Sequence, residues 1–257
     1  DDIDNIYGYY HILLDNKVTK LLKAQGYRMV YLRERYAPKG NYSGGDVYFG
    51  CEIIGRVALN AEGFAGALLH TTALEPVLRK FAFLEADRTF LRSCDFSQLI
   101  KSKDLDGPKM VIIHLLGPGK AFLVGTGTVA SYLEQMDFTN EGLSRVVDAL
   151  TSDPDYSPVI VIQGDHGEGS FFGTEGSLAT DPDTIPAKMG IMNAYHLPQG
   201  GNSVLYPTIS PVNTFRVIFD YYLGGNFGLV EDRLWFSTGV AFEFQDVTEI
   251  MKEVVGE

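Results

Sequence analysis

The chain has 257 residues, of which 45% are hydrophobic and 21% are charged, and this composition is typical of a globular protein. Its 21 basic and 33 acidic side chains give a net charge of −12, which argues against non-specific nucleic-acid binding and against docking on anionic lipid. No run of about 18 uninterrupted apolar residues occurs, so we expect no membrane-spanning helix. The length fits one large α/β domain or two small ones, and because no composition break marks a linker we expect one domain over residues 1–257.

Apolar periodicity and Gly or Pro punctuation divide the chain into helices and strands. In chain order, the expected elements are a helix over residues 16–25, a strand over 27–32, a loop over 34–50, a helix over 68–84, a strand over 110–116, a helix over 139–150, a strand over 159–162, a loop over 167–186, a strand over 189–195 and a helix over 211–223. Since strands alternate with helices, the sequence predicts an α/β fold with a doubly wound, mostly parallel sheet sandwiched by helices.

Short local signals predict the helix ends and the buried helix faces. Gly26 and Gly224 accept the left-handed conformation at low cost and should end the first and last of these helices. Thr139 should cap the middle one. Helical spacing predicts that Val18 and Val212 lie on the apolar, inward faces of their helices.

The most informative segment begins with the four β-branched residues 159–162, which predict a strand buried on both faces of a parallel sheet. Asp165 and His166 follow side by side between glycines, where ligand sites of such sheets lie. One oxygen and one nitrogen ligand suit zinc or manganese, so we expect Asp165 and His166 to bind a divalent metal. The alternative interpretation is an ordinary turn with a helix cap.

Other candidate residues carry weaker signals. His114 closes the strand over 110–116 and could reach the same pocket, although a histidine there is more often a core residue. Lys188 and Arg216 are candidate cations for binding an anion, with surface placement as the alternative. The two cysteines, Cys51 and Cys94, lack metal-knuckle spacing, and either a disulfide or two free thiols is open.

Several segments together resemble the membrane-anchored, sulfatase-like branch of the alkaline phosphatase superfamily, which includes lipoteichoic acid synthases. The matching segments cover nearly the whole chain in order: residues 16–18 through 26–27, 71–74, 107–109, 114–118, 159–167, 191–198, 205–207 and 210–216.

The resemblance implies an alkaline phosphatase-like sandwich that binds a divalent metal, zinc or manganese, and acts on phosphate or sulfate esters. It implies that Asp165 and His166 are metal ligands, that His114 faces the substrate pocket and that Lys188 contacts the anionic group. It further implies an extracytoplasmic, membrane-associated location through a segment outside this chain, and a membrane protein or an upstream segment as a possible partner.

The chain departs from the family at its start. In relatives, a nucleophilic Thr or Ser and the first acidic metal ligand precede the segment that matches residues 16–18. Here Asp1, Asp2 and Asp4 are acidic, but they lack the strand context of that ligand. We therefore expect the nucleophile region to be missing from this chain.

Two further departures concern the substrate pocket. After His114, relatives commonly carry a His-Pro-Pro-Phe run, whereas this chain has Gly-Lys-Ala-Phe at residues 119–122. An Arg of the relatives is Lys188 here, which keeps the charge but loses the bidentate geometry. Three hypotheses remain: an incomplete metal-dependent hydrolase or transferase domain, a catalytically degenerate relative that serves as a binding or structural subunit of a membrane-associated assembly, and a likeness of fold alone.

Overall fold

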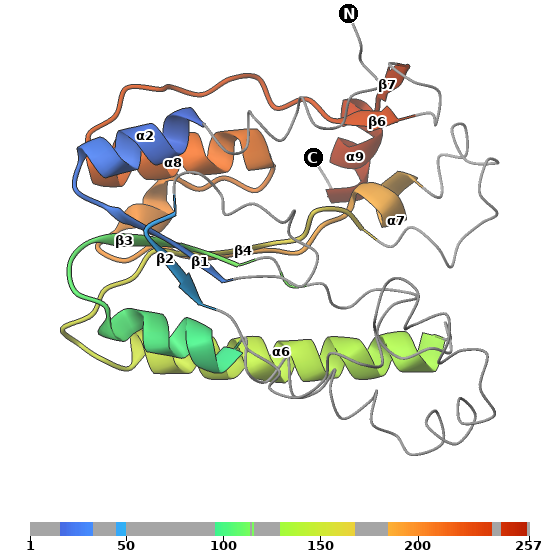
Figure 1. Cartoon of the computed structure of the whole chain (residues 1–257). Coiled ribbons are helices and arrows are strands. Elements are labelled where there is room, and N and C mark those ends of the chain that lie inside the picture. The colour runs from blue at the N-terminus through green and yellow to red at the C-terminus, as the bar shows by residue number, and fades with distance from the viewer. Residues whose placement is uncertain are drawn as a thin grey trace, which may run out of the picture. The chain divides into compact units, whose positions relative to one another are not determined.

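The computed structural model describes the part of the chain made up of residues 16–32, 45–49, 96–113, 115, 129–167, 185–237 and 243–255 (Figure 1). The chain divides into two units, Asp1–Ser152 and Asp153–Glu257, each of which makes most of its contacts internally. The fold is mixed α/β, with a three-stranded parallel sheet in the first unit, so the prediction is confirmed at the level of fold class.

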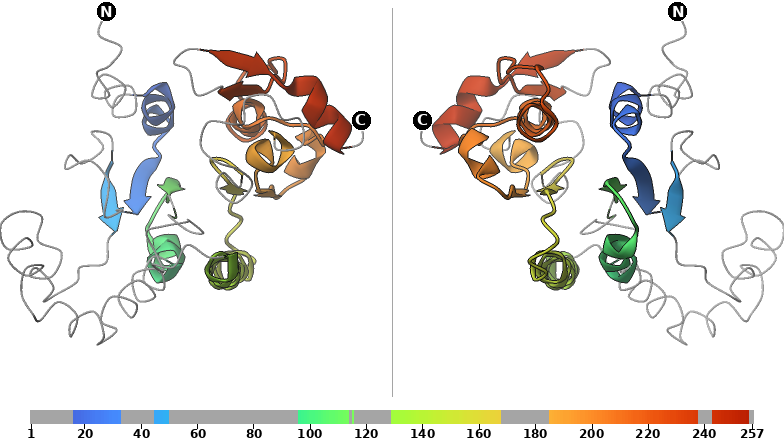
Figure 2. Two further views of the ribbon diagram at one scale, coloured as in Figure 1. Left: turned by 90° about the vertical axis from the view of Figure 1, so that its right-hand side faces the viewer. Right: turned by 90° about the vertical axis from the view of Figure 1, so that its left-hand side faces the viewer.

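The first unit is built around the sheet β2-β1-β3, in which β1 (Arg28–Leu32) lies between β2 (Val47–Phe49) and β3 (Lys109–Ile112) (Figure 2). Both neighbours run parallel to β1, with Val30 opposite Val47 and Met29 opposite Met110. Four of the five β1 residues are buried, as expected for a central parallel strand. The sequence missed β2, because its three residues stand in a Gly-rich segment that favoured a loop.

Helix α2 (Lys17–Ala24) confirms the first predicted helix. The Asn16 side chain caps it by accepting a hydrogen bond from the Thr19 amide at 2.7 Å, and Gly26 follows its end with φ +83°. The predicted apolar face is partly wrong, because Val18 is 40% exposed and Thr19 is buried instead. The buried face of α2 is therefore rotated by one residue from the face that the apolar residues alone predict.

Helix α6 (Val129–Thr151) is twice as long as the sequence predicted. Thr139 was expected to cap a helix, but it lies inside α6 and is buried, so this prediction is wrong. At Gly142, a Cβ atom would lie 2.1 Å from the Phe96 ring, so only glycine permits this packing between α6 and the helical residues 96–101. Val146 and Leu150 are buried on the inner face of this helix.

The second unit contains β4 (Ile160–Gln163) and β5 (Asn193–His196), which pair antiparallel. The existence of both strands is confirmed, but the expected parallel, fully buried environment of β4 is not what the described residues show. Among the described residues, the only strand that pairs with β4 is the antiparallel β5, and all four residues of β4 are half-buried. The adjacent Val159 is 38% exposed.

Helix α8 (Pro211–Leu223) has the predicted bounds, with Ser210 before Pro211 at its start and Gly224 at φ +63° after its end. Val217, Ile218 and Phe219 pack with Leu197 in one apolar core. The prediction for Val212 is wrong, since its side chain is 62% exposed.

A second apolar cluster joins α7 (Ile185–Met189), the hairpin of β6 (Trp235–Ser237) and β7 (Phe244–Asp246), and α9 (Thr248–Val255). Ile185, Phe236 and Val247 are its buried members. The sequence predicted none of these four elements, which are three to eight residues long. Among the described residues, no helix is both long and apolar enough to cross a membrane.

Candidate functional site

The Asp165–His166 turn (residues 164–167) follows β4 directly and leaves both side chains exposed. Gly164 still pairs with β5, donating its amide to the Met192 carbonyl at 2.8 Å. The chain then bends, and the side chains of Asp165 and His166 are 75% and 73% exposed. The sequence placed this pair at the carboxyl end of a strand, and the structure agrees with that position.

Gly167 fixes where this turn lies relative to α7. Its amide donates to the Lys188 carbonyl at 2.8 Å, which satisfies a carbonyl in the last turn of α7. A Cβ atom at Gly167 would lie 2.2 Å from the Ala187 carbonyl oxygen and 2.7 Å from that of Gly190. Because both obstacles are backbone atoms, no other residue fits here without moving the turn away from α7.

Two internal hydrogen bonds leave one oxygen and one nitrogen of the pair available. His166 Nδ1 lies 2.7 Å from the Gly167 carbonyl oxygen, and since a carbonyl only accepts, Nδ1 carries the proton. In the neutral ring, Nε2 is then an acceptor with a lone pair. Asp165 Oδ1 accepts from the His166 amide at 3.1 Å, and Asp165 Oδ2 lies 3.7 Å from Nε2.

This geometry fits a divalent metal. Ligands at about 2.0–2.2 Å from a tetrahedral ion lie roughly 3.4 Å from each other, close to the 3.7 Å between Oδ2 and Nε2. A metal-binding histidine usually donates its second ring N–H to a carbonyl or carboxylate, as His166 does. Within the described residues no group of three or more His, Cys, Asp or Glu side chains could hold a metal, so this pair could supply at most two ligands there.

Lys188 belongs to α7 and is bonded to the turn through its carbonyl. Its ammonium lies 5.9 Å from the centre of the Phe236 ring, a cation–π contact worth about 0.5–1 kcal/mol at an exposed site. The backbone of Lys188 is thus bonded to the Asp165–His166 turn, while the role of its side chain stays a prediction.

The remaining candidates do not gather there within the described residues. His114 lies outside them, as do Cys51 and Cys94. Arg216, a candidate anion-binding cation, donates to the Phe227 and Gly228 carbonyls at 3.0 and 3.2 Å and so holds a loop.

A polar network around Asp232 was missed by the sequence analysis, since its members are far apart in the chain. Asp232 accepts from the Tyr206 hydroxyl at 2.5 Å, from the Ser210 amide at 2.9 Å and from the fully buried Asn213 at 2.9 Å. Burial raises the pKa of Tyr206 to about 12, and Asp232 acts in the same direction. Burial opposes ionisation of Asp232, but hydrogen bonds from Ser210 and Tyr206 outweigh it and lower the Asp232 pKa. The network ties the start of α8 to residues 230–232.

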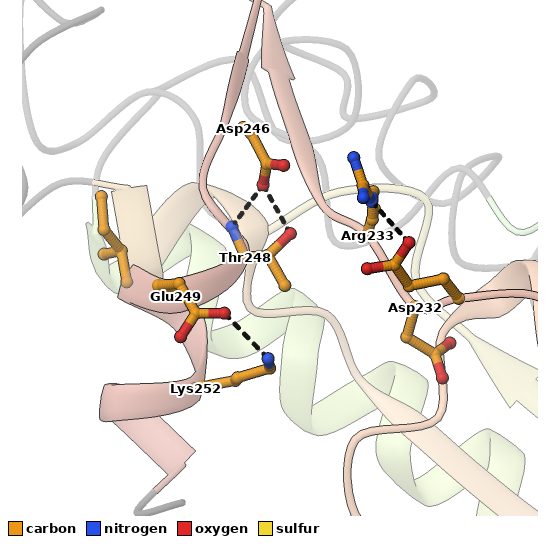
Figure 3. A pocket seen from close by; sticks show the side chains of 8 residues that line it. Asp232, Arg233, Asp246, Thr248, Glu249 and Lys252 are labelled. Atoms are coloured by element: carbon orange, nitrogen blue, oxygen red, sulfur yellow. Dashed lines mark hydrogen bonds and ion pairs between the residues drawn. The ribbon is translucent and has the colours of Figure 1, made fainter.

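The second unit also contains an open hollow of about 490 Å³ with a mostly charged lining (Figure 3). It is lined by Glu231, Asp232, Arg233, Asp246, Thr248, Glu249, Ile250 and Lys252. Arg233 pairs with Glu231 at 2.9 Å, Lys252 pairs with Glu249 at 2.8 Å, and Asp246 accepts from the Thr248 amide and hydroxyl. These charges are engaged with one another, and the hollow shows no group aimed at a ligand.

Comparison of the chain with protein-family models, with curated proteins and with solved structures finds no match. The assignment of the site therefore stands on the residues and their geometry.

Proposed function

We propose that this chain is part of a metal-dependent hydrolase or transferase domain that acts on phosphate or sulfate esters. The observation that supports it best is the Asp165–His166 pair, in which Oδ2 and Nε2 lie 3.7 Å apart while both partner atoms, Oδ1 and Nδ1, are held by backbone groups. The hydrogen bond at Nδ1 leaves Nε2 of the neutral ring as the atom that can bind a metal, and an ordinary turn does not require this arrangement.

In this proposal Asp165 and His166 hold zinc or manganese, whose charge would stabilise the anionic oxygens of the ester. Lys188 would contribute a second positive charge on the strength of the family resemblance, and its backbone is bonded to the turn at Gly167. His114 belongs to the substrate pocket on the strength of the family resemblance. The nucleophile and further metal ligands come from outside the described residues.

The proposal includes the doubly wound, alkaline phosphatase-like architecture. The three-stranded parallel sheet of the first unit supports it, because parallel sheets occur mainly in α/β folds whose helices cover both faces of the sheet. Three strands are few for a doubly wound sheet. We also propose the extracytoplasmic, membrane-associated location that the family resemblance implies, with a membrane protein or upstream segment as partner.

A second candidate function is favoured by a specific observation: the described residues provide two metal ligands, whereas a zinc site takes at least three protein ligands. In that case the chain is a catalytically degenerate relative that serves as a binding or structural subunit of a membrane-associated assembly.

Metal titration separates the two. We expect the wild-type chain to bind Mn²⁺ or Zn²⁺ by calorimetry, with Asp165→Ala at least tenfold weaker. Asp155→Ala is the matched control, because Asp155 is an exposed carboxylate that precedes β4 rather than following it. Equal binding by wild type and Asp165→Ala would contradict the metal site. With metal bound, turnover of nitrophenyl phosphate or nitrophenyl sulfate would support the enzyme, whereas no turnover together with a stoichiometric partner in a pull-down would support the degenerate subunit.

A further inference from the structure

The last residue pair of the β4–β5 ladder is a pair of amide side chains. Gln163 lies opposite Asn193, and Gln163 Nε2 donates to Asn193 Oδ1 at 2.9 Å. Each of the other three pairs in this ladder contains at least one apolar or aromatic side chain. The two amides thus stand at the end of the ladder that leads into the Asp165–His166 turn.

The amide pair lies next to the turn that carries the proposed metal ligands. Pairing continues one residue past β4, because the Gly164 amide donates to the Met192 carbonyl. Gln163 lies two residues before Asp165, at the end of β4 from which the turn leaves. Asn193 is directly opposite Gln163, so the side chains of this pair leave the ladder on one face, next to the turn.

The bond from Gln163 fixes which way the Asn193 amide is turned. Oδ1 faces Gln163, so Nδ2 and its two N–H groups face away from it. The Asn193 side chain is exposed, and among the described residues Nδ2 has no hydrogen-bond partner. It is a neutral, pre-oriented donor next to a site that we assign to an anionic ester.

We propose that Asn193 Nδ2 donates to an anionic oxygen of the phosphate or sulfate group, and that Gln163 positions Asn193 for this role. The inference rests on the proposed function and adds the group that binds the anion. Amide side chains that point at a developing or resident negative charge are a common means of stabilising it. A neutral donor does this without repelling a neighbouring cation, as a lysine or arginine would.

The test uses the full chain and inorganic phosphate, titrated by calorimetry with and without saturating Mn²⁺. In Asn193→Asp, an acceptor of the same shape replaces the amide donor and carries the same negative charge as phosphate. We expect this variant to bind phosphate at least tenfold more weakly, while its Mn²⁺ affinity stays within twofold of wild type. Asn202→Asp is the matched control, since it adds the same charge at an exposed Asn beyond the opposite end of β5. It should bind phosphate like wild type.

Gln163→Glu tests the positioning role. A carboxylate cannot donate to Asn193 Oδ1, so the amide would turn its Nδ2 toward Glu and present its oxygen to the anion. We expect Gln163→Glu to bind phosphate at least fivefold more weakly while its midpoint of urea unfolding stays that of wild type. If Gln163 had only a structural role, the midpoint would fall instead.

Two results would overturn the inference: phosphate affinity of Asn193→Asp within twofold of wild type, or no phosphate binding by wild type in either condition. Failure of the proposed function looks different. There, Asp165→Ala would bind Mn²⁺ like wild type while Asn193→Asp still lost phosphate, which would leave an anion site without a metal.

Discussion

Gly167→Ala should be among the most damaging single-methyl additions in the second unit. The new Cβ would lie 2.2 Å from the Ala187 carbonyl oxygen, whereas a carbon and an oxygen normally approach to about 3.3 Å. Relief requires the turn to move by roughly 1 Å away from α7, because the obstacle is backbone. The Gly167 amide, now 2.8 Å from the Lys188 carbonyl, would lose that bond.

The expected destabilisation follows from these two effects. Overpacking of this kind costs about 1–3 kcal/mol, and one lost hydrogen bond costs about 0.5–1.5 kcal/mol. We therefore expect the free energy of unfolding to fall by about 2–4 kcal/mol. The movement also shifts the carbonyl that accepts from His166 Nδ1, so Mn²⁺ binding should weaken at least tenfold.

Urea unfolding followed by circular dichroism measures the first effect, and calorimetric Mn²⁺ titration measures the second. Gly164→Ala is the matched control in the same turn, since its Cβ would approach nothing closer than 3.5 Å. The control should lose less than about 1 kcal/mol. If Gly167→Ala is as stable as Gly164→Ala, the turn is not packed against α7 as the structure has it.

Two further predictions concern pH. Tyr206 has its pKa raised from 10.0 to about 12 by burial and by its bond to Asp232, so its contribution to stability is full below pH 10 and is lost as pH rises through 12. Tyr206→Phe should cost about 1–3 kcal/mol at pH 7, and urea unfolding should show the gap to wild type closing between pH 10 and 12; a constant gap would contradict this. The Asp46 pKa is lowered below its ordinary 3.8, first by the hydrogen bond from Lys23, so its contribution is present above pH 3.8 and is lost as pH falls further. Because both side chains are 37% exposed, Asp46→Asn should cost only about 1 kcal/mol at pH 7, and acid titration of unfolding should show this difference from wild type shrinking as pH falls below 3.8.

The elements that sequence predicted well are those whose ends carry their own chemistry. α2 has Asn16 before it and Gly26 after it, and α8 has Ser210-Pro211 before it and Gly224 after it. Such caps act within four residues of the helix end, so the helix ends can be predicted from the sequence without knowledge of the fold. The strand before Asp165 was predictable for a similar reason, because four β-branched residues in a row strongly favour extended backbone.

The elements that sequence missed depend on partners far away in the chain. β2 has three residues and exists through pairing with β1, some 17 positions earlier. Asp46 supports that pairing by accepting from the Met29 amide at 2.8 Å. Thr139 has the composition of a cap but sits within α6, where packing along 23 residues overrides the preference of one.

The sequence by itself determined that an acid and an imidazole follow a strand, because adjacency and β-propensity are properties of a few neighbouring residues. Only the tertiary structure decided that β4 pairs antiparallel with β5, that Asn193 lies opposite Gln163, and that the Gly167 amide bonds the turn to α7. These depend on backbone groups about 20 to 30 positions apart meeting at hydrogen-bond distance. No local preference encodes such a meeting, since it is set by how whole elements bury their apolar faces.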